Sequence, residues 1–179
     1  MQIVKLNATT STNTYLRAYA KKLDVVEDTI VWAAEQLAGR GQRGAFWESE
    51  KDKNLTFSLF KRVGEMRIDR QFYITMATSL AVYDALKQLG IEQLSVKWPN
   101  DILAGRSKIC GGLIESVIRN GLYAVIIGVG LNVNQRLFVR APRATSIALE
   151  TGKHHELEEI LNILISKFYH YVELIAQGQ

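Results

Sequence analysis

Cysteine, histidine and proline are scarce in this sequence of 179 residues. Cys110 is the single cysteine, which excludes an internal disulfide and a cluster of thiolate metal ligands. The three histidines all lie near the C-terminus, and neither an HExxH pair nor a P-loop GK[ST] motif is present. These absences argue against a histidine-rich metal site and against a P-loop.

Long apolar runs and long basic tracts are also missing. No apolar stretch approaches the length of a membrane span, and the first residues do not resemble a secretory signal peptide. The 22 lysines and arginines are scattered among 18 acidic residues, so the net charge of +4 is not the footprint of a nucleic-acid or membrane-surface binder. With 47% apolar residues, we expect one cytoplasmic domain over residues 1–179, large enough for a hydrophobic core.

The spacing of apolar residues predicts interspersed strands and helices. Strands are expected at 2–6, 29–34, 55–60, 95–98, 108–119 and 122–133, and Asn120-Gly121 is a hairpin signal between the last two. Residues 35–54 are polar and rich in glycine, so a long loop is expected there. This order favours an α+β fold, a mixed and largely antiparallel sheet backed by helices, over a doubly wound fold.

Helices are expected after an N-cap at Ser11, from Asp69 to Gly90, over 144–152 and over 156–176. Two apolar faces are predicted for them. The first helix would bury Tyr15, Leu16, Tyr19 and Leu23. The long second helix would bury Phe72, Met76, Leu80, Tyr83 and Leu86.

The stretch AGRGQRGAFW (38–47) has the spacing G-x-G-x-x-G, which is typical of dinucleotide-binding loops. Such a loop must lead directly into a helix that holds the pyrophosphate, and here a polar segment and then a strand follow instead. Arg40 and Arg43 offer planar cations suited to carboxylate and phosphate oxygens, and Phe46-Trp47 supplies an aromatic cover. We interpret the stretch as a loop that closes over an anionic ligand; a flexible surface loop is the alternative.

Two further clusters surround short turns or glycines. Lys97, Asn100 and Asp101 in KWPNDIL place a cation, an amide and a carboxylate at a strand end, which suits phosphate and Mg²⁺, although a simple turn is the alternative. In SKICGGLIES (107–116), Lys108 heads a strand that contains two glycines, and glycine within a strand often marks close approach of a ligand or of another backbone. A bulge with a surface lysine is the alternative, and this cluster taken alone favours it. Cys110 is interpreted as a small buried hydrophobe.

Two more polar clusters are open to two interpretations. In IIGVGLNVN (126–134) the glycines could serve tight strand packing, and the amides of Asn132 and Asn134 could face a purine edge. Ser11-Thr12-Asn13 could cap a helix or contribute to a site.

The segments STNTYL, AEQLAGRGQRGAFW, KWPNDIL, SKICGGLIES and IIGVGLNVN, in this order, resemble the biotin protein ligase family, the biotin–[acetyl-CoA carboxylase] ligases. The resemblance covers residues 11 to about 134 and continues weakly to the last helix. It implies a catalytic fold related to class II aminoacyl-tRNA synthetases. It also implies that biotin and ATP with Mg²⁺ give biotinyl-5′-AMP, from which a lysine of a biotin carboxyl carrier protein takes the biotinyl group.

The resemblance also implies roles for individual residues. Those expected in the biotin pocket are Ser11, Thr12, Asn13, Gln36, Gly39, Arg40, Gly41, Lys108 and Gly111. Those expected at the nucleotide are Arg40, Gln42, Arg43, Trp47, Lys97, Asn100, Asp101, Gly128, Gly130 and Asn132. Lys108, Arg40 and Lys97 would be catalytic, and Asp101 would be a ligand of Mg²⁺.

The chain departs from the family pattern in three places. We expect no counterpart of the N-terminal winged helix of repressor-type members, and hence no DNA-linked autoregulation. We also expect no counterpart of the small SH3-like C-terminal domain, which puts efficient transfer in doubt. Gln42 and Ala45 stand where some members have basic residues, so weaker retention of the adenylate is expected.

Alternative functions remain open at this point. A lipoate or octanoyl ligase or transferase shares the fold, and a biotin-binding remnant with weak transfer activity would share the pocket. A nucleic-acid binder is suggested only by RGQRG and the net charge. A homodimer is possible, with residues 122–127 as an edge strand for self-pairing or for the carrier.

Overall fold

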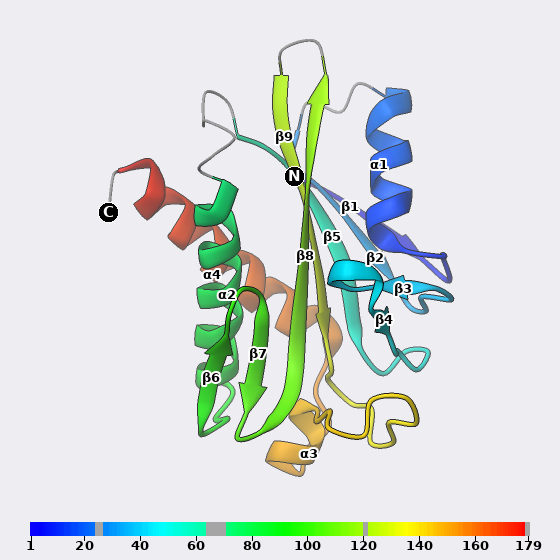
Figure 1. Ribbon diagram of the computed structural model, residues 1–179, viewed down its shortest axis with the longest axis vertical. Helices are drawn as coiled ribbons and strands as arrows, with labels where there is room; N and C mark the ends of the chain where they lie inside the picture. The colour runs from blue at the N-terminus through cyan, green and yellow to red at the C-terminus, as the bar shows by residue number, and fades with distance from the viewer. Residues whose placement is uncertain (24–26, 64–70, 120–121, 178–179) are drawn as a thin grey trace.

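A computed structural model of the protein describes residues 1–23, 27–63, 71–119 and 122–177. A sheet of seven strands forms its centre, in the order β1-β2-β5-β9-β8-β7-β6 (Figure 1). Its strands are β1 (Gln2–Leu6), β2 (Thr29–Ala33), β5 (Leu55–Arg62), β6 (Leu94–Lys97), β7 (Asp101–Ala104), β8 (Ser107–Arg119) and β9 (Leu122–Leu131). Only the β1–β2 pair is parallel among these described strands, which confirms the predicted α+β fold with a mixed, largely antiparallel sheet.

Helices cover both faces of this sheet. On one face lies α1 (Thr12–Leu23), and on the other lie α2 (Gln71–Gln88) and α4 (Leu157–Ala176), which pack against each other (Figure 1). Successive side chains of each strand point to opposite faces of the sheet, so each strand contributes to the core on both faces. Ile30 of β2 is buried in the cluster of α2 and α4, and its neighbour Val31 is buried in the cluster of α1. The hydrophobic core is therefore split by the sheet into two layers.

The buried side of α2 differs from the predicted one. Phe72, Met76 and Leu80 are exposed, whereas Leu86 is buried as predicted and Tyr83 is half-buried. The helix instead buries the side that carries Ile74, Ala77, Thr78, Ala81, Val82 and Ala85. Both sets repeat at helical spacing, and the alanines allow α4 to approach closely. The prediction favoured the larger side chains and was wrong at these three positions.

Other element boundaries also moved. The predicted loop 35–54 contains a small hairpin of β3 (Gly39–Arg40) and β4 (Phe46–Trp47), joined through the short 3₁₀ helix η1 (Gln42–Gly44). The predicted helix 144–152 is shortened to α3 (Ile147–Thr151), because Ser146 caps its N-terminus through a hydrogen bond from Leu149 N–H. The expected turn Asn120-Gly121 and the expected helix start at Asp69 lie outside the described residues.

One predicted role of a strand is wrong. Residues 122–127 were expected to be available as an edge strand, but β9 lies between β5 and β8 and pairs with both. A central strand has its backbone groups satisfied on both sides and cannot pair with a further chain. In the described part of the molecule, the outermost strands are β1 and β6.

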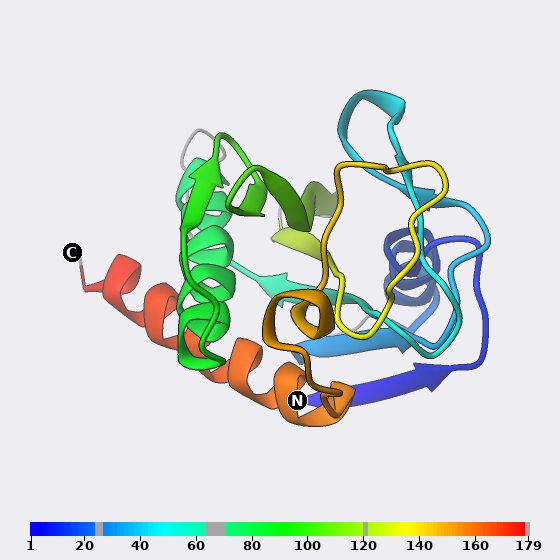
Figure 2. The same ribbon diagram turned by 90° about the horizontal axis from the view of Figure 1, so that it is seen from below.

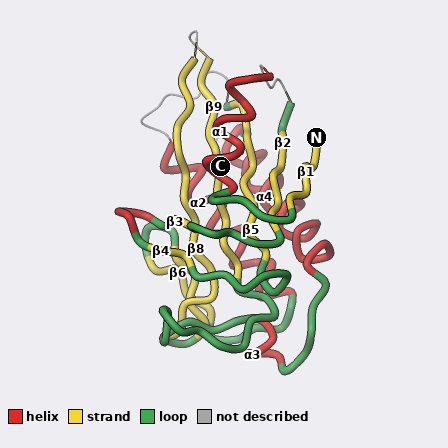
Figure 3. Tube along the Cα trace, turned by 90° about the vertical axis from the view of Figure 1, so that its right-hand side faces the viewer, coloured by secondary structure: helices red, strands yellow, loops and turns green. Residues whose placement is uncertain are grey.

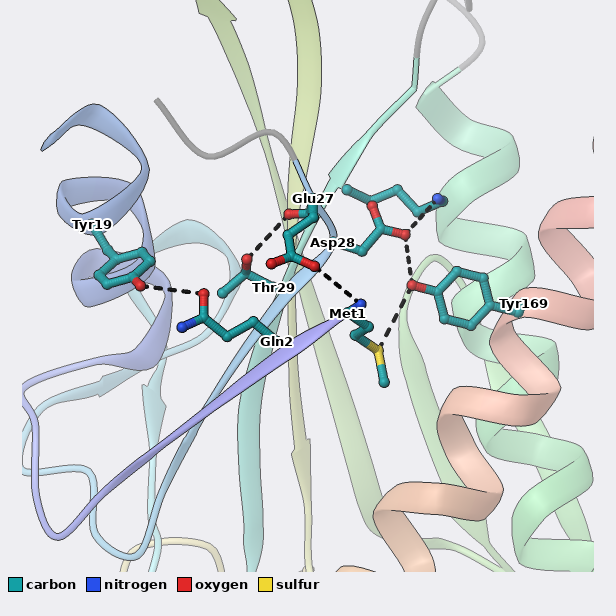
Figure 4. A network of polar contacts seen from close by, with 8 residues as sticks. Met1, Gln2, Tyr19, Glu27, Asp28, Thr29 and Tyr169 are labelled. Carbon is teal, nitrogen blue, oxygen red and sulfur yellow. Dashed lines mark hydrogen bonds and ion pairs between the residues drawn. The ribbon is translucent and has the colours of Figure 1, made fainter. Parts of the chain in front are cut away.

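A polar network ties α4 to the β1 edge of the sheet (Figure 4). Tyr169 of α4 donates a hydrogen bond of 2.6 Å to Asp28, and the ammonium group of Lys61 lies 2.7 Å from the same carboxylate oxygen. Burial, and then the Asp28 carboxylate, raise the pKa of the Tyr169 phenol. The network therefore holds α4 in place while the phenol stays protonated.

None of the described helices is long and apolar enough to span a membrane.

Candidate functional site

A cleft of about 560 Å³ opens on the α1 face of the sheet. Along β9 this face carries Ala124 and Ile126 beneath α1, and then Gly128 and Gly130 beyond the helix. Because the helix ends before Gly128 and Gly130 and these glycines have no side chains, the backbone of the sheet forms the floor of the cleft at this point. The loops and the β3–β4 hairpin gather at this end of the sheet, away from the end where β8 stops (Figure 3).

The cleft brings together most of the predicted site residues. They come from the start of α1, the β3–β4 hairpin, the turn between β6 and β7, and strands β8 and β9. The predicted residues that line it are Ser11, Thr12, Asn13, Gln36, Arg40, Gly41, Gln42, Trp47, Lys97, Asn100, Asp101, Lys108, Gly111, Gly128 and Gly130. Gly39 lies just behind the lining, packed against Trp47, and Asn132 lines a neighbouring cavity. The side chain of Arg43 lies outside the described residues.

The N-terminus of α1 forms a polar floor for the cleft. Ser11, Thr12 and Asn13 are all buried. Thr12 donates its backbone N–H to Gln36 Oε1 at 2.8 Å, and its hydroxyl lies 3.2 Å from the same oxygen. Ser58 of β5, which the sequence analysis did not identify, lies fully buried beneath Thr12 with its hydroxyl 2.7 Å from the Thr12 hydroxyl. The sequence signal that could have identified Ser58 is that it is a polar residue within an otherwise largely apolar strand.

Lys108 and Asp101 form an ion pair at the other end of the cleft. The Lys108 ammonium lies 2.7 Å from Asp101 Oδ1 and 5.5 Å from the centre of the Trp47 ring. The backbone around Lys108 is fixed by hydrogen bonds with Arg143 and Thr145, while its side chain keeps 38% of its exposure. A fixed strand therefore presents a partly exposed cation to the cleft.

The Trp47 ring lies against the bare glycine surface. A Cβ placed on Gly130 would overlap the indole ring, and one on Gly111 would come within 3.3 Å of it. The indole N–H is buried and has no hydrogen-bond partner among the described residues. Glycine at these positions thus makes room for the aromatic cover that the hairpin provides.

Arg40 and Lys97, the other two predicted catalytic residues, lie at exposed positions around the cleft. Arg40 lies at the rim and donates a hydrogen bond of 2.8 Å to the Thr14 hydroxyl, and Gln42 is exposed beside it. Lys97 is exposed at the end of β6. Asn100 is tied to β8, because Gly112 N–H donates to its carbonyl at 3.0 Å and its amide group donates to the Gly112 carbonyl. The turn that precedes β7 is therefore fastened to β8.

A second cavity of about 330 Å³ adjoins the cleft, and Phe46, Trp47 and Lys108 line both. Its outer wall is the segment 138–144, which runs beside the β3–β4 hairpin (Figure 2). Glu48 joins the two by accepting hydrogen bonds of 2.8 Å from the backbone N–H groups of Val139 and Arg140. Hairpin and segment thus form a continuous roof.

The two asparagines after β9 have different roles. Asn132 Nδ2 donates to the Thr145 carbonyl at 2.9 Å, and its buried Oδ1 has no partner among the described residues and belongs to a side chain that lines the second cavity. Asn134 uses both ends of its amide on the backbone of His155. The interpretation that both amides could face a purine is therefore wrong for Asn134.

Metal and thiol chemistry can be assessed from the same residues. The described residues contain no group of three or more His, Cys, Asp or Glu side chains that could hold a metal ion. Mg²⁺ is commonly held by one or two carboxylates together with substrate phosphates, so the single carboxylate of Asp101 is compatible with it. Cys110 is buried, which confirms its interpretation as a small buried hydrophobe, and this burial raises the pKa of its thiol to about 12.

Known proteins share both the sequence pattern and the fold. The bifunctional ligase/repressor BirA of Bacillus subtilis is 34% identical over 111 residues, which cover 62% of this chain and 34% of that protein. The biotin–[acetyl-CoA-carboxylase] ligase of Mycobacterium tuberculosis is 33% identical over 142 residues, which cover 78% of this chain and 52% of that protein. The chain thus spans about a third to a half of these relatives.

A solved structure gives the same result in three dimensions. The biotin protein ligase from Aquifex aeolicus, in complex with biotin and ATP, matches 96% of this chain and 70% of its own with a TM-score of 0.80 and 26% identity. The family model for the biotin/lipoate A/B protein ligases matches residues 6–132, which contain the N-terminus of α1, the β3–β4 hairpin, Lys108 and the glycines of β9. The chain therefore belongs to the biotin/lipoate A/B protein ligase family.

Proposed function

We propose that this chain activates biotin with ATP to form biotinyl-5′-AMP and transfers the biotinyl group to a lysine of a biotin carboxyl carrier protein. The observation that carries the proposal is the position of Lys108, whose side chain lines both the polar cleft and the adjoining cavity. A cation at the junction of two cavities is placed to contact the groups that react, with one substrate on each side. The Aquifex aeolicus relative is described in complex with both biotin and ATP, which supports two substrates in one site.

The first step suits a site without histidine. The biotin carboxylate is an anion at neutral pH, so no base is required for its oxygen to attack the α-phosphorus of ATP with departure of pyrophosphate. The barrier comes from bringing two anions together in line. Lys108, Arg40 and Lys97 are the cations of the cleft lining whose side chains the structure describes, and they would offset this repulsion.

Asp101 has two roles in this proposal. Without substrate it neutralises Lys108 through their 2.7 Å ion pair, so the lysine is held in one orientation. When substrate oxygens compete for the ammonium group, the carboxylate becomes available to a cation. Asp101 would then hold Mg²⁺, which supplies positive charge next to the phosphates.

The second cavity suits the adenine base. Its lining combines the aromatic Phe46, Trp47 and Phe138 with the amide of Asn132. The buried Asn132 Oδ1 lacks a partner among the described residues, and an unsatisfied buried acceptor is costly. The exocyclic amino group of adenine would donate a hydrogen bond to it, and the aromatic side chains would cover the base.

Transfer requires that the adenylate is protected from water until an amine arrives. The β3–β4 hairpin, with Trp47 over the glycines and Glu48 fastened to segment 138–144, is placed to give this protection. The lysine amine of the carrier would then attack the carbonyl carbon, and AMP would leave. We propose no role for DNA or a membrane. A cytoplasmic location stays a prediction, as does a homodimer, for which β9 is not available.

The proposal is tested by biotin-dependent exchange of pyrophosphate into ATP, followed by transfer to a carrier domain detected with streptavidin. Wild type should be active in both assays, and Lys108→Ala should lose adenylate formation with an unchanged melting temperature. A matched control is Lys87→Ala, which removes an exposed lysine of α2 outside the cleft lining. Turnover with lipoic acid in place of biotin would support the lipoate ligase alternative, and exchange without transfer would support the remnant.

A further inference from the structure

The amide group of Asn13 has one fixed orientation at the polar end of the cleft. The side chain is buried, and its Nδ2 donates to the Leu113 carbonyl at 3.2 Å and to Glu115 Oε2 at 2.8 Å. A primary amide has two N–H donors, so both are used. Turning the amide over would place Oδ1 against a carbonyl and a carboxylate, which are both acceptors. The two β8 groups therefore determine which end of the amide faces Gly128.

The carbonyl end of this amide remains able to accept a hydrogen bond. Asn13 Oδ1 lies directly over Gly128, where a Cβ would overlap it. The Ser58 hydroxyl lies 2.5 Å from it and 2.7 Å from the Thr12 hydroxyl, and its one hydrogen can serve only one of them. Since a carbonyl oxygen has two lone pairs, Oδ1 keeps at least one for a ligand.

Gln36 supplies the opposite polarity on the same side of the cleft. Its Oε1 accepts from Thr12, so the amide cannot turn over without losing the backbone hydrogen bond of 2.8 Å. Gln36 lines the cleft, and no described residue accepts a hydrogen bond from its Nε2, so this group keeps its donors for a ligand. A fixed acceptor and a fixed donor together match a cyclic urea, which has N–H donors and a carbonyl acceptor. A dithiolane ring has no N–H group to give to Oδ1.

We infer that Glu115 is a positioning residue that sets the ligand selectivity of the cleft by holding Asn13 Oδ1 toward the ligand. The inference rests on the proposed function and adds a residue that makes the pocket bind the ureido ring of biotin more tightly than the dithiolane ring of lipoic acid. Glu115 is itself held, because Arg17 of α1 lies 3.4 Å from its other carboxylate oxygen. Glu115 does not line the cleft, so it acts through Asn13.

The test compares Glu115→Ala with wild type, using biotin in pyrophosphate exchange and both biotin and lipoic acid as probes in calorimetry. Loss of one charge-assisted hydrogen bond predicts that the Kd and KM for biotin rise on the order of 10- to 100-fold. The kcat and the KM for ATP should stay within about twofold, and lipoic acid binding should not weaken, because it makes no N–H contact. Glu115→Gln keeps an acceptor for Asn13 and should recover most of the biotin affinity.

Two controls make the outcomes distinct. Glu158→Ala removes a carboxylate whose ion pair with Lys5 lies outside the cleft lining, and should change nothing. Asn13→Ala removes the acceptor itself and should give the same selective loss if Glu115→Ala fails to fold. The inference is overturned if Glu115→Ala leaves biotin binding within twofold, or weakens biotin and lipoic acid equally. A wild-type chain that neither binds nor activates biotin would instead refute the proposed function.

Discussion

Gly128→Ala should weaken biotin binding, lower the free energy of unfolding, or do both, with the fold retained. The added methyl group would overlap Asn13 Oδ1 and lie 2.9 Å from Asn13 Cγ, a distance that real Cβ contacts essentially never show. Asn13 cannot turn away freely, because its amide is anchored on β8 through the Leu113 carbonyl and Glu115. The mutation must therefore either displace the amide or shift β9 against β5 and β8.

The size of the effect follows from the hydrogen bonds at risk. Displacing the amide breaks the charge-assisted bond to Glu115, worth about 1.5–3 kcal/mol, and forcing an extra methyl group into a packed site costs about 1–3 kcal/mol. If the amide moves, the Kd for biotin should rise on the order of 10- to 100-fold. If the strand moves, the cost should appear as a lower free energy of unfolding. The sum of both changes, measured by calorimetry and by urea unfolding, should exceed about 1.4 kcal/mol.

Gly112→Ala is the matched control. Gly112 lies in the neighbouring strand β8, and a Cβ there would meet its nearest atoms at 3.7–3.8 Å, which is ordinary contact. This variant should keep the biotin affinity within about twofold. A Gly128→Ala variant that binds biotin and unfolds like wild type would refute the role of this glycine as the space for Asn13.

Three further predictions concern other parts of the structure. Gly130→Ala would displace the Trp47 ring that lies over it, so the intrinsic fluorescence should change and the KM for ATP should rise several-fold; an unchanged spectrum would contradict this packing. Gln42→Arg adds a cation at the rim and should slow release of the adenylate, measured by filter retention; unchanged release would show that charge at this position has no effect. Burial and Asp28 raise the pKa of the Tyr169 phenol in the folded protein above the unfolded value of about 10. The hydrogen bond from the protonated phenol to Asp28 therefore contributes its full stability below a pH of about 10, and this contribution is lost as the pH rises further. Tyr169→Phe should therefore lose stability at pH 7 and show a shallower decline above pH 10 in urea unfolding; equal slopes would contradict the assignment.

The sequence was sufficient to predict most strands, the last helix and the convergence of the site. The motifs around Ser11, Lys97 and Lys108 are short and lie at the ends of strands or helices. Several polar side chains clustered at such ends indicate a binding site. These segments do meet at one cleft. The fold class followed from the order of elements, because β6, β7, β8 and β9 follow one another in the chain and pair antiparallel with their neighbours in the sheet.

What the sequence could not predict depends on partners distant in the chain. The buried side of α2 was misassigned because two apolar stripes compete, and only the position of α4 decides between them. Asn134 could not be distinguished from Asn132 until His155 was placed next to it. Glu115 is separated from Asn13 by 102 residues, so its hydrogen bond has no local signature.

The most direct test of the central claim is biotin-dependent exchange of labelled pyrophosphate into ATP by this chain. Exchange that requires biotin, that lipoic acid does not replace and that Lys108→Ala abolishes is the predicted result. Exchange that is absent in the folded wild-type chain at saturating biotin and ATP, or that persists in the Lys108→Ala variant, would contradict the account.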